Sequence, residues 1–527
     1  MPEIAAAWTQ HQEWFYESSF FFQNDSGYAN QDIQPPGSNL YKLFLERAFR
    51  LLNDGGCAGV IVPDGFYSSS ATQALRQFFL RECRIDSIYC FENRWPEVFT
   101  AVHNSFKFIT LVFRRGEPGL AFRCAFMQHD PSRLPAIESG AIWMKPEHVE
   151  RFSPDSFSIT EFNSQRDVEI AEKLYADYPL LGRMVQTTWN FPLLSAEFNM
   201  THQSGMFRDS GPGYTLYEGK MISQYDHQFS PGRFVIGHRD AEEYLLSKEL
   251  RRIGRSSRLS QLIERGEVKP RLPLCRYRFG VRSIASSTNE RAIIATVLPK
   301  NVCVAHSLFT AIPWEYAESN LLSECDAGWY LDHFESGELV LVVSILNSFL
   351  YDWAIRMKIS SNVNFFILNQ LPMPRLSVDN EFRQRIVARA LRLICTTEEY
   401  AALWAEVFPQ MSTATLTTLR SAPAAYGPAH EQALRERVAK SAAGLTPTWT
   451  SACGLHDRTP QRRDTGDRAQ TRAELDALVA HLYGLTKGEF AYLLDAFPVL
   501  RRKELAAFGE YQSKRKALQE YDRFGSY

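Results

Sequence analysis

The stretch Ala58-Gly59-Val60-Ile61-Val62-Pro63 decides the fold class of this chain. It is a short apolar run with three consecutive β-branched residues and a proline at its end, which is typical of a strand buried in a parallel sheet. Before it, apolar residues recur at helical spacing from Leu40 to Leu51, and Asp54-Gly55-Gly56 ends the helix. A helix followed by a buried strand predicts an α/β fold.

The same alternation continues after this strand. A second amphipathic stretch follows Ser68-Ser69-Ser70, and strand-like runs then cover residues 85–91 and 106–113. This order is that of the second half of a doubly wound, Rossmann-like sheet, and the last two runs are close enough to form an antiparallel hairpin. We therefore expect a partial α/β domain over residues 1–116.

The remaining chain divides by pattern into two further regions. Residues 117–380 mix strand-like and irregular segments with many Gly, Pro and Ser residues, which predicts a mixed α+β domain. Residues 381–527 are mostly helical in pattern, with a low-complexity stretch at about residues 411–455 that we expect to be a flexible insertion. The aromatic-rich first thirty residues leave two explanations open: a segment that packs against something outside this chain, or a flap over its own domain.

Composition excludes several classes of protein. The formal net charge of 527 residues is −2, which argues against a purely electrostatic DNA binder but not against a cleft with basic lining. None of the nine cysteines stands two to four residues from another, so no zinc finger or other metal site is indicated. The chain begins without a secretory signal and has no apolar run of membrane-spanning length, so we expect a cytoplasmic protein with reduced thiols.

The common catalytic patterns are missing. The sequence contains no phosphate loop ending in Gly-Lys-Ser/Thr, no His-Glu-x-x-His and no Gly-x-Ser-x-Gly. It also has no Gly-x-Gly turn after an apolar strand, which a nucleotide-type cofactor needs for close approach of the backbone. The residues alone therefore nominate no reaction.

A longer run carries a resemblance. Asn39-Leu40-Tyr41-Lys42-Leu43-Phe44-Leu45-Glu46-Arg47-Ala48, followed by Gly59-Val60-Ile61-Val62-Pro63, resembles the segment after the catalytic motif of large N6-adenine DNA methyltransferases. The likeness continues in the same order to the end of the chain, through residues 91–108, 217–227, 282–291, 364–372 and 474–511. The family comprises type IIG restriction-modification enzymes and the methyltransferases of phage-exclusion defence systems.

The resemblance implies an enzyme that transfers a methyl group from S-adenosylmethionine to adenine N6 in double-stranded DNA. The family binds this cofactor through a glycine-rich loop and catalyses with Asn/Asp-Pro-Pro-Tyr/Phe, and this sequence has neither. The chain thus resembles the carboxyl-terminal portion: part of the catalytic sheet in residues 1–116, the target-recognition domain in 117–380 and a helical region in 381–527. The cofactor site would be incomplete, and we expect a partner chain to carry the missing half. A DNA-recognition subunit without catalysis and an inactive fragment remain as alternatives.

Three residues are candidates for the catalytic half. Phe99 stands where the relatives place an aromatic ring that stacks on the flipped base, although a loop aromatic before a strand can also simply pack. Asn39 and Tyr41 stand where the relatives line the cofactor or target-base pocket. A helix cap and a packed aromatic ring explain these two residues without a ligand.

Seven residues are candidates for contacts with DNA. Lysine beside glycine on a turn can reach a phosphate, arginine can read guanine, and asparagine can read adenine. A solvated surface lysine, a basic strand face and an Asx turn are the corresponding structural explanations. The candidates are Lys220, Arg278, Arg282, Asn289, Arg291, Asn362 and Asn364.

Overall fold

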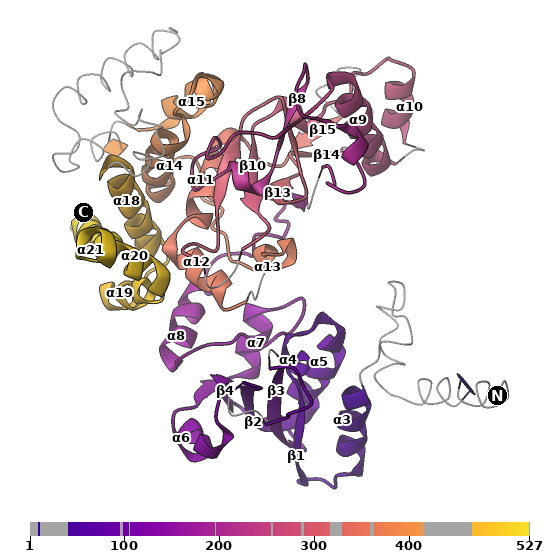
Figure 1. Cartoon of the computed structure of the whole chain (residues 1–527), viewed down its shortest axis with the longest axis vertical. Coiled ribbons are helices and arrows are strands. Elements are labelled where there is room, and N and C mark those ends of the chain that lie inside the picture. The colour runs from indigo at the N-terminus through magenta and orange to yellow at the C-terminus, as the bar shows by residue number, and fades with distance from the viewer. Residues whose placement is uncertain are drawn as a thin grey trace. The chain divides into compact units, whose positions relative to one another are not determined.

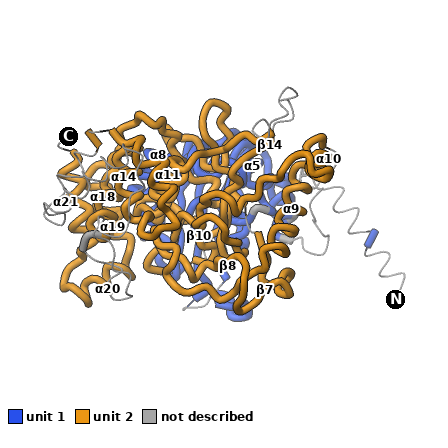
Figure 2. The backbone as a smooth tube through the Cα atoms, turned by 90° about the horizontal axis from the view of Figure 1, so that it is seen from above, with its two compact units in different colours: residues 1–175 blue, residues 176–527 orange. Residues whose placement is uncertain are grey.

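A computed structural model of the chain divides into two compact units, residues 1–175 and 176–527, which Figure 2 colours separately. The structure describes residues 9–10, 40–94, 98–104, 106–194, 197–254, 257–285, 289–316, 329–358, 363–412, 414–415 and 466–525. The aromatic-rich start of the chain and most of the predicted insertion at 411–455 lie outside these residues.

Unit 1 is built on a five-stranded mixed sheet in the order β1-β3-β2-β4-β5 (Figure 1). β3 is antiparallel to both β1 and β2, so β1 and β2 run parallel to each other; β4 is parallel to β2, and β5 is antiparallel to β4. The strands are β1 (Cys57–Pro63), β2 (Cys83–Glu92), β3 (Lys107–Arg115), β4 (Phe122–Gln128) and β5 (Ile142–Met144).

Short helices pack along this sheet. α3 contacts β1, α5 contacts β2, and α6 contacts β4. A core cluster of Tyr89, Phe91, Phe108, Ala125 and Ile137 holds β2, β3, β4 and α6 together. The helices are α3 (Leu40–Leu51), α4 (Gly65–Ser68), α5 (Gln73–Glu82), α6 (Leu134–Ser139), α7 (Pro146–Phe152) and α8 (Gln165–Leu174).

The predicted α/β order of unit 1 is confirmed, with two corrections. The helices and strands expected between residues 40 and 113 are present, and β2 and β3 form the expected antiparallel pair. The predicted boundary at residue 116 is too early, because β4 and β5 extend the same sheet and the unit ends at Tyr175. The predicted buried strand, β1, lies at the edge of the sheet, and no described strand pairs with its outer side.

Unit 2 combines small sheets with helices (Figure 1). One four-stranded sheet has the order β11-β10-β13-β6, a second has the order β12-β8-β9-β7, and β14 pairs with β15. The strands are β6 (Leu193–Leu194), β7 (Phe207–Arg208), β8 (Tyr214–Tyr217), β9 (Phe234–Ile236), β10 (Arg278–Arg282), β11 (Ala295–Leu298), β12 (Val302–Val304), β13 (Leu308–Ala311), β14 (Trp314–Tyr316) and β15 (Tyr330–Asp332).

The helices of unit 2 fall into two groups. α9 packs on the second sheet through Ala241 and Leu245, while α10 packs near β14 and β15 through Leu259 and Ile263. The other group holds the buried α11 and the carboxyl-terminal helices. The helices are α9 (His238–Ile253), α10 (Arg258–Glu264), α11 (Ser336–Leu346), α12 (Phe349–Arg356), α13 (Phe365–Asn369), α14 (Glu381–Ile394), α15 (Ala401–Val407), α18 (Gly466–Leu482), α19 (Lys487–Asp495), α20 (Pro498–Phe508) and α21 (Gln512–Gly525).

The predicted boundary at residue 381 does not separate compact bodies. α14 contacts both α11 and α18, so the mixed region and the helical region share one core. Among the described residues, no single helix is long and apolar enough to span a membrane. α11 and α12 reach that length together, but they bend by 61° and lie buried in unit 2.

Candidate functional site

The carboxyl ends of β1 and β2 meet at one edge of the sheet in unit 1. Pro63 at the end of β1 pairs with Phe108, and Glu92 at the end of β2 pairs with Lys107. β3 begins between these two ends, and the connection that carries Phe99 joins β2 to β3. In open α/β sheets, ligands bind outside the carboxyl ends of the parallel strands. This edge is therefore the candidate site of unit 1.

A charged cluster lies at this edge. The Lys107 ammonium nitrogen is 2.8 Å and 2.9 Å from the two carboxylate oxygens of Glu161. The Tyr67 hydroxyl donates a hydrogen bond of 2.5 Å to the same carboxylate. Burial would lower the pKa of Lys107, but its hydrogen bond and ion pair with Glu161 outweigh burial and raise it. Lys107 therefore stays charged at this edge at neutral pH.

Asp64, directly after β1, lies in the electrostatic field of the same cluster. Its pKa is raised, first by burial, against the opposing effect of Lys107. Asp64 and Lys107 therefore place a carboxyl group and an ammonium group at this edge.

Phe99 is both packed and accessible. Its ring meets the Phe108 ring edge to face, with centroids 5.0 Å apart, and Phe108 stacks on Phe91 at 5.4 Å. Even so, 38% of Phe99 is exposed, so the ring offers free surface at this edge. Phe99 therefore packs on the core and still presents apolar surface to solvent, and its stacking on a base stays a prediction.

Tyr41 lies in α3, beside the end of β1. Its hydroxyl is so close to Gly65 that a side-chain carbon at Gly65 would lie 3.1 Å from it. Burial raises the pKa of Tyr41 to about 12, so the hydroxyl stays protonated. Asn39 lies outside the described residues. A nucleotide-type cofactor needs a glycine-rich turn that lets the backbone approach it closely, whereas Gly65 is crowded by Tyr41 and belongs to no such turn. The described residues by themselves therefore do not fit S-adenosylmethionine.

Unit 2 brings three of the DNA candidates to neighbouring segments. Arg282 donates a hydrogen bond to the Ile222 carbonyl, which joins the end of β10 to the turn that carries Lys220. The amide of Val363 donates to the carbonyl of Ser283 at 2.9 Å and brings Asn364 to the same strand end. The segments that carry Lys220 and Asn364 therefore each contact the end of β10 that carries Arg282, and we call these three segments the strand-end surface.

The strand-end surface also carries exposed apolar side chains that the sequence did not single out. Phe229 lies under the Arg282 guanidinium, 5.9 Å from its ring centroid. Ile284 follows Arg282 by two residues, and Phe365 and Phe366 follow Asn364. All four side chains are exposed. Basic, amide and apolar groups together are what contacts with phosphates, base edges and base faces require.

Arg278 is not part of this surface, and the predicted DNA contact is incompatible with its burial. Its side chain is fully buried, forms an ion pair with Glu197 and donates to the Val302 carbonyl. Arg278 begins β10 and Arg282 ends it, so only Arg282 lies at the end that contacts the turn with Lys220. Arg278 therefore stabilises the core of unit 2.

Arg291 also has a structural position. Its guanidinium lies 2.9 Å from Asp352 and 4.1 Å from the ring centroid of Phe349, and it donates to the Asn347 carbonyl. Asn289 is exposed, and its carbonyl accepts a hydrogen bond from Arg356. Both residues thus contact the α11–α12 region, whereas Asn362 lies outside the described residues.

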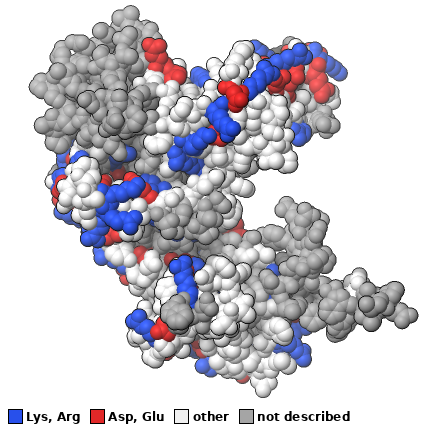
Figure 3. All heavy atoms as spheres, in the orientation of Figure 1, with Lys and Arg blue, Asp and Glu red and all other residues white. Residues whose placement is uncertain are grey.

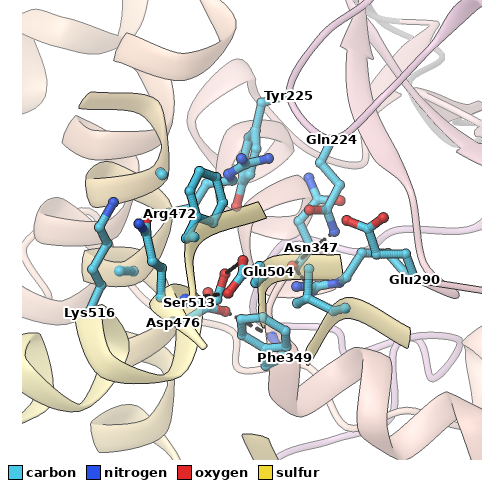
Figure 4. Close-up of a pocket in the computed structure, with 16 residues that line it drawn as sticks. Gln224, Tyr225, Glu290, Asn347, Phe349, Arg472, Asp476, Glu504, Ser513 and Lys516 are labelled. Atoms are coloured by element: carbon cyan, nitrogen blue, oxygen red, sulfur yellow. Dashed lines mark hydrogen bonds between the residues drawn. The ribbon is translucent and has the colours of Figure 1, made fainter. Parts of the chain in front are cut away.

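A cavity of about 360 Å³ in unit 2 lies between the carboxyl-terminal helices and the α11–α12 region. Figure 4 shows Lys516 and Ser513 on one side of it and Asn347 and Glu290 on the other. The amide of Gln224 donates to the carbonyls of Ile293 and Asn347 at 3.1 Å and 3.2 Å. Residues from three sequence segments that resemble the methyltransferase family, 217–227, 282–291 and 474–511, thus line this cavity. There they join the carboxyl-terminal helices to the α11–α12 region.

Charge is mixed over the surface of unit 2. On the face in Figure 3, basic and acidic side chains alternate over the part that carries α9 and α10. α9 itself contains paired charges, such as Arg239 with Glu243 at 2.7 Å. This mixture agrees with the small net charge and leaves local groups, rather than a broad field, to attract DNA.

The comparisons with known proteins address the class of protein. Residues 14–99 match the model of the Eco57I restriction-modification methylase family. The resemblance to restriction-modification methyltransferases is thereby confirmed, and a methylase-family segment lies in unit 1. A search of curated proteins finds no match.

Three solved structures show limited similarity. The type IIG restriction endonuclease BpuSI is 15% identical, with a TM-score of 0.27, over 71% of this chain and 47% of its own. The type IIL restriction-modification enzyme MmeI in complex with DNA is 9% identical, with a TM-score of 0.35, over 89% and 53%. The type ISP enzyme LlaBIII bound to DNA is 10% identical, with a TM-score of 0.32, over 74% and 28%. This chain therefore spans about half of these proteins or less.

Proposed function

We propose that this chain is the DNA-recognising portion of an adenine-specific, site-specific DNA methyltransferase that works in the cytoplasm in restriction-modification or anti-phage defence. The observation that carries the proposal is the family match over residues 14–99, together with the family-like runs that continue in order to residue 511. The mixed sheet of unit 1, in which β3 lies between the parallel strands β1 and β2, supports it further.

The strand-end surface of unit 2 binds double-stranded DNA in this proposal. Lys220 contacts a phosphate, while Arg282 and Asn364 face base edges. The exposed rings of Phe365 and Phe366 give apolar contact with bases. The sequence that is recognised depends on how these groups are placed together.

The carboxyl edge of unit 1 receives the target adenine after it leaves the duplex. Phe99 stacks on the base, and stacking of this kind contributes about 1–3 kcal/mol. Lys107 and Asp64 supply an ammonium group and a carboxyl group at the same edge. When S-adenosylmethionine is bound, it supplies the methyl group that replaces one hydrogen of the exocyclic amine. The glycine-rich loop that binds this cofactor in the family and the Asn/Asp-Pro-Pro-Tyr/Phe motif do not occur in these 527 residues, so they come from outside this sequence.

The test is complementation. The purified chain is mixed with the polypeptide encoded immediately upstream, if that polypeptide ends near the missing motif, and with radiolabelled S-adenosylmethionine and a random DNA pool. We expect no cofactor heat by calorimetry with this chain alone and labelled N6-methyladenine only in the mixture. Cofactor binding by the chain alone would contradict the divided site. DNA binding without methylation in any mixture would identify a recognition subunit instead.

A further inference from the structure

Asn93 binds the backbone of the connection between β2 and β3 through five hydrogen bonds. Its side-chain nitrogen donates hydrogen bonds of 2.8 Å to the carbonyls of Phe99 and Val102. Its side-chain oxygen accepts from the amides of Val98 and Phe99 at 3.1 Å and 2.9 Å. Its own amide donates to the Phe106 carbonyl at 2.9 Å.

These contacts use the full hydrogen-bonding capacity of the Asn93 side chain. An amide group has two donor hydrogens and two acceptor positions, and Asn93 uses all four within the backbone of residues 98–102. A rotated amide would set its hydrogens against the two backbone N–H groups, so the contacts also fix its orientation. Only 1% of Asn93 is exposed, so water cannot replace a lost partner without rearrangement.

The residue held most firmly is Phe99, because both its N–H and its C=O bind Asn93. The held segment also presents apolar surface, since Val98, Phe99 and Val102 are all exposed. Because these side chains are only partly buried, the segment gains less from burial than a core segment does, and polar contacts help to keep its shape. Asn93 supplies those contacts from the buried end of β2.

We infer that Asn93 is a positioning residue that fixes Phe99 as the platform for the target base. The ligand in this inference rests on the proposed function, whereas the arrangement of the connection rests on the hydrogen bonds alone. Aspartate keeps the two acceptor contacts but loses both donors, and alanine loses all four. The two substitutions therefore separate the contacts to the amides of Val98 and Phe99 from those to the carbonyls of Phe99 and Val102.

The first measurement is hydrogen exchange of the full chain over residues 98–104. Asn93→Ala should speed exchange at Val98 and Phe99 by about tenfold or more, because these amides lose their acceptor. Asn93→Asp should leave these two amides protected. Thr72→Val is the matched control, since Thr72 is a buried polar residue of unit 1 that binds the carbonyls of Gly65 and Ser69. Unchanged exchange in Asn93→Ala would overturn the inference.

The second measurement asks whether Phe99 meets a base. A duplex pool carries 5-iodouracil opposite a mismatched thymine, which costs little to unstack, and light cross-links the iodinated base to an aromatic ring stacked on it. We expect cross-linking at Phe99 in the unaltered chain, about tenfold less in Asn93→Ala at equal DNA retention on filters, and no loss in Thr72→Val. Equal cross-linking in Asn93→Ala would overturn the inference alone. Loss of DNA retention by the unaltered chain would overturn the proposed function.

Discussion

Arg278 and Glu197 form a buried ion pair in unit 2. Both side chains are buried, and Glu197 also accepts the Val304 amide at 2.9 Å. Arg278 looked like a base-reading residue because its partner lies 81 positions away, and no local pattern reveals such a contact. Burial and pairing at this scale come from tertiary structure, so composition and spacing alone cannot separate a core arginine from a surface one.

Removal of one partner should therefore be costly. Glu197→Ala leaves the Arg278 guanidinium buried without its counter-charge, and we expect the free energy of unfolding to fall by about 3–5 kcal/mol. Urea unfolding measures this value. Glu243→Ala removes an exposed carboxylate from its pair with Arg239 and should change the same quantity by about 0.5 kcal/mol or less. Equal effects of the two substitutions would contradict the structural position of Glu197.

Asp476 should make the stability of unit 2 depend on pH. Burial raises its pKa from 3.8 to about 6, although Arg291, the Phe349 amide and Arg472 act in the opposite direction. Because the folded state holds this proton more tightly than the unfolded state, stability is lost as pH rises from about 4 to about 6. Asp476→Asn removes the titration and keeps an oxygen for the Phe349 amide.

A comparison of Asp476→Asn with the unaltered chain isolates the contribution of the Asp476 carboxyl group. Between pH 4 and pH 8, the unfolding free energy of Asp476→Asn should gain up to about 3 kcal/mol on that of the unaltered chain, at about 1.4 kcal/mol per pKa unit. Urea titrations at several pH values give the difference. A difference that does not vary with pH would show that Asp476 has the same pKa in both states.

At the scale of elements, local sequence patterns were enough to predict the helices and strands of unit 1 from α3 to β3. The apolar spacing of α3, the glycines that follow it and the β-branched run of β1 are all local features of the sequence. The parallel pairing of β4 with β2 depends on residues distant in sequence, so the sequence ended the domain too early. The sequence also could not show that Asn93 binds Phe99, because an asparagine after a strand has many local uses.

β1 keeps the sequence of a buried strand although it lies at the sheet edge. Ile61 is 59% exposed, and the described residues give the outer side of β1 no partner. Apolar edge strands pair readily with other chains, and a lysine on the edge prevents such pairing. We therefore expect Ile61→Lys to reduce concentration-dependent self-association while the unfolding free energy changes by about 0.5 kcal/mol or less.

Light scattering over a range of protein concentrations measures this effect. Leu120→Lys provides the control, because Leu120 is 93% exposed in the turn between β3 and β4 and receives the same change of charge. If both substitutions reduce association equally, net charge rather than the edge of β1 is responsible. In the complementation assay, a loss of methylation in Ile61→Lys alone would identify β1 as the contact with the added polypeptide.

At the scale of the whole molecule, the proposed DNA-binding surface and the methylase-family segment belong to different units. The family match ends at residue 99 in unit 1, whereas the strand-end surface lies in unit 2. With a net charge of −2, the chain has no broad field to hold DNA, so a few local cations should dominate the salt dependence of binding. Lys220 is the clearest of them, because its side chain is 55% exposed at the strand-end surface.

Lys220→Ala should weaken binding to all DNA sequences by a similar factor. One lost phosphate contact lowers the slope of log affinity against log salt concentration by about 1, and fluorescence anisotropy at several salt concentrations gives that slope. Lys487→Ala is a close match, because Lys487 is 53% exposed and paired with Asp522, as Lys220 is paired with Glu218. An unchanged slope in Lys220→Ala, or the same decrease in slope in Lys487→Ala, would show that the strand-end surface does not contact DNA through Lys220. A selective loss for some sequences would instead mean that Lys220 reads a base.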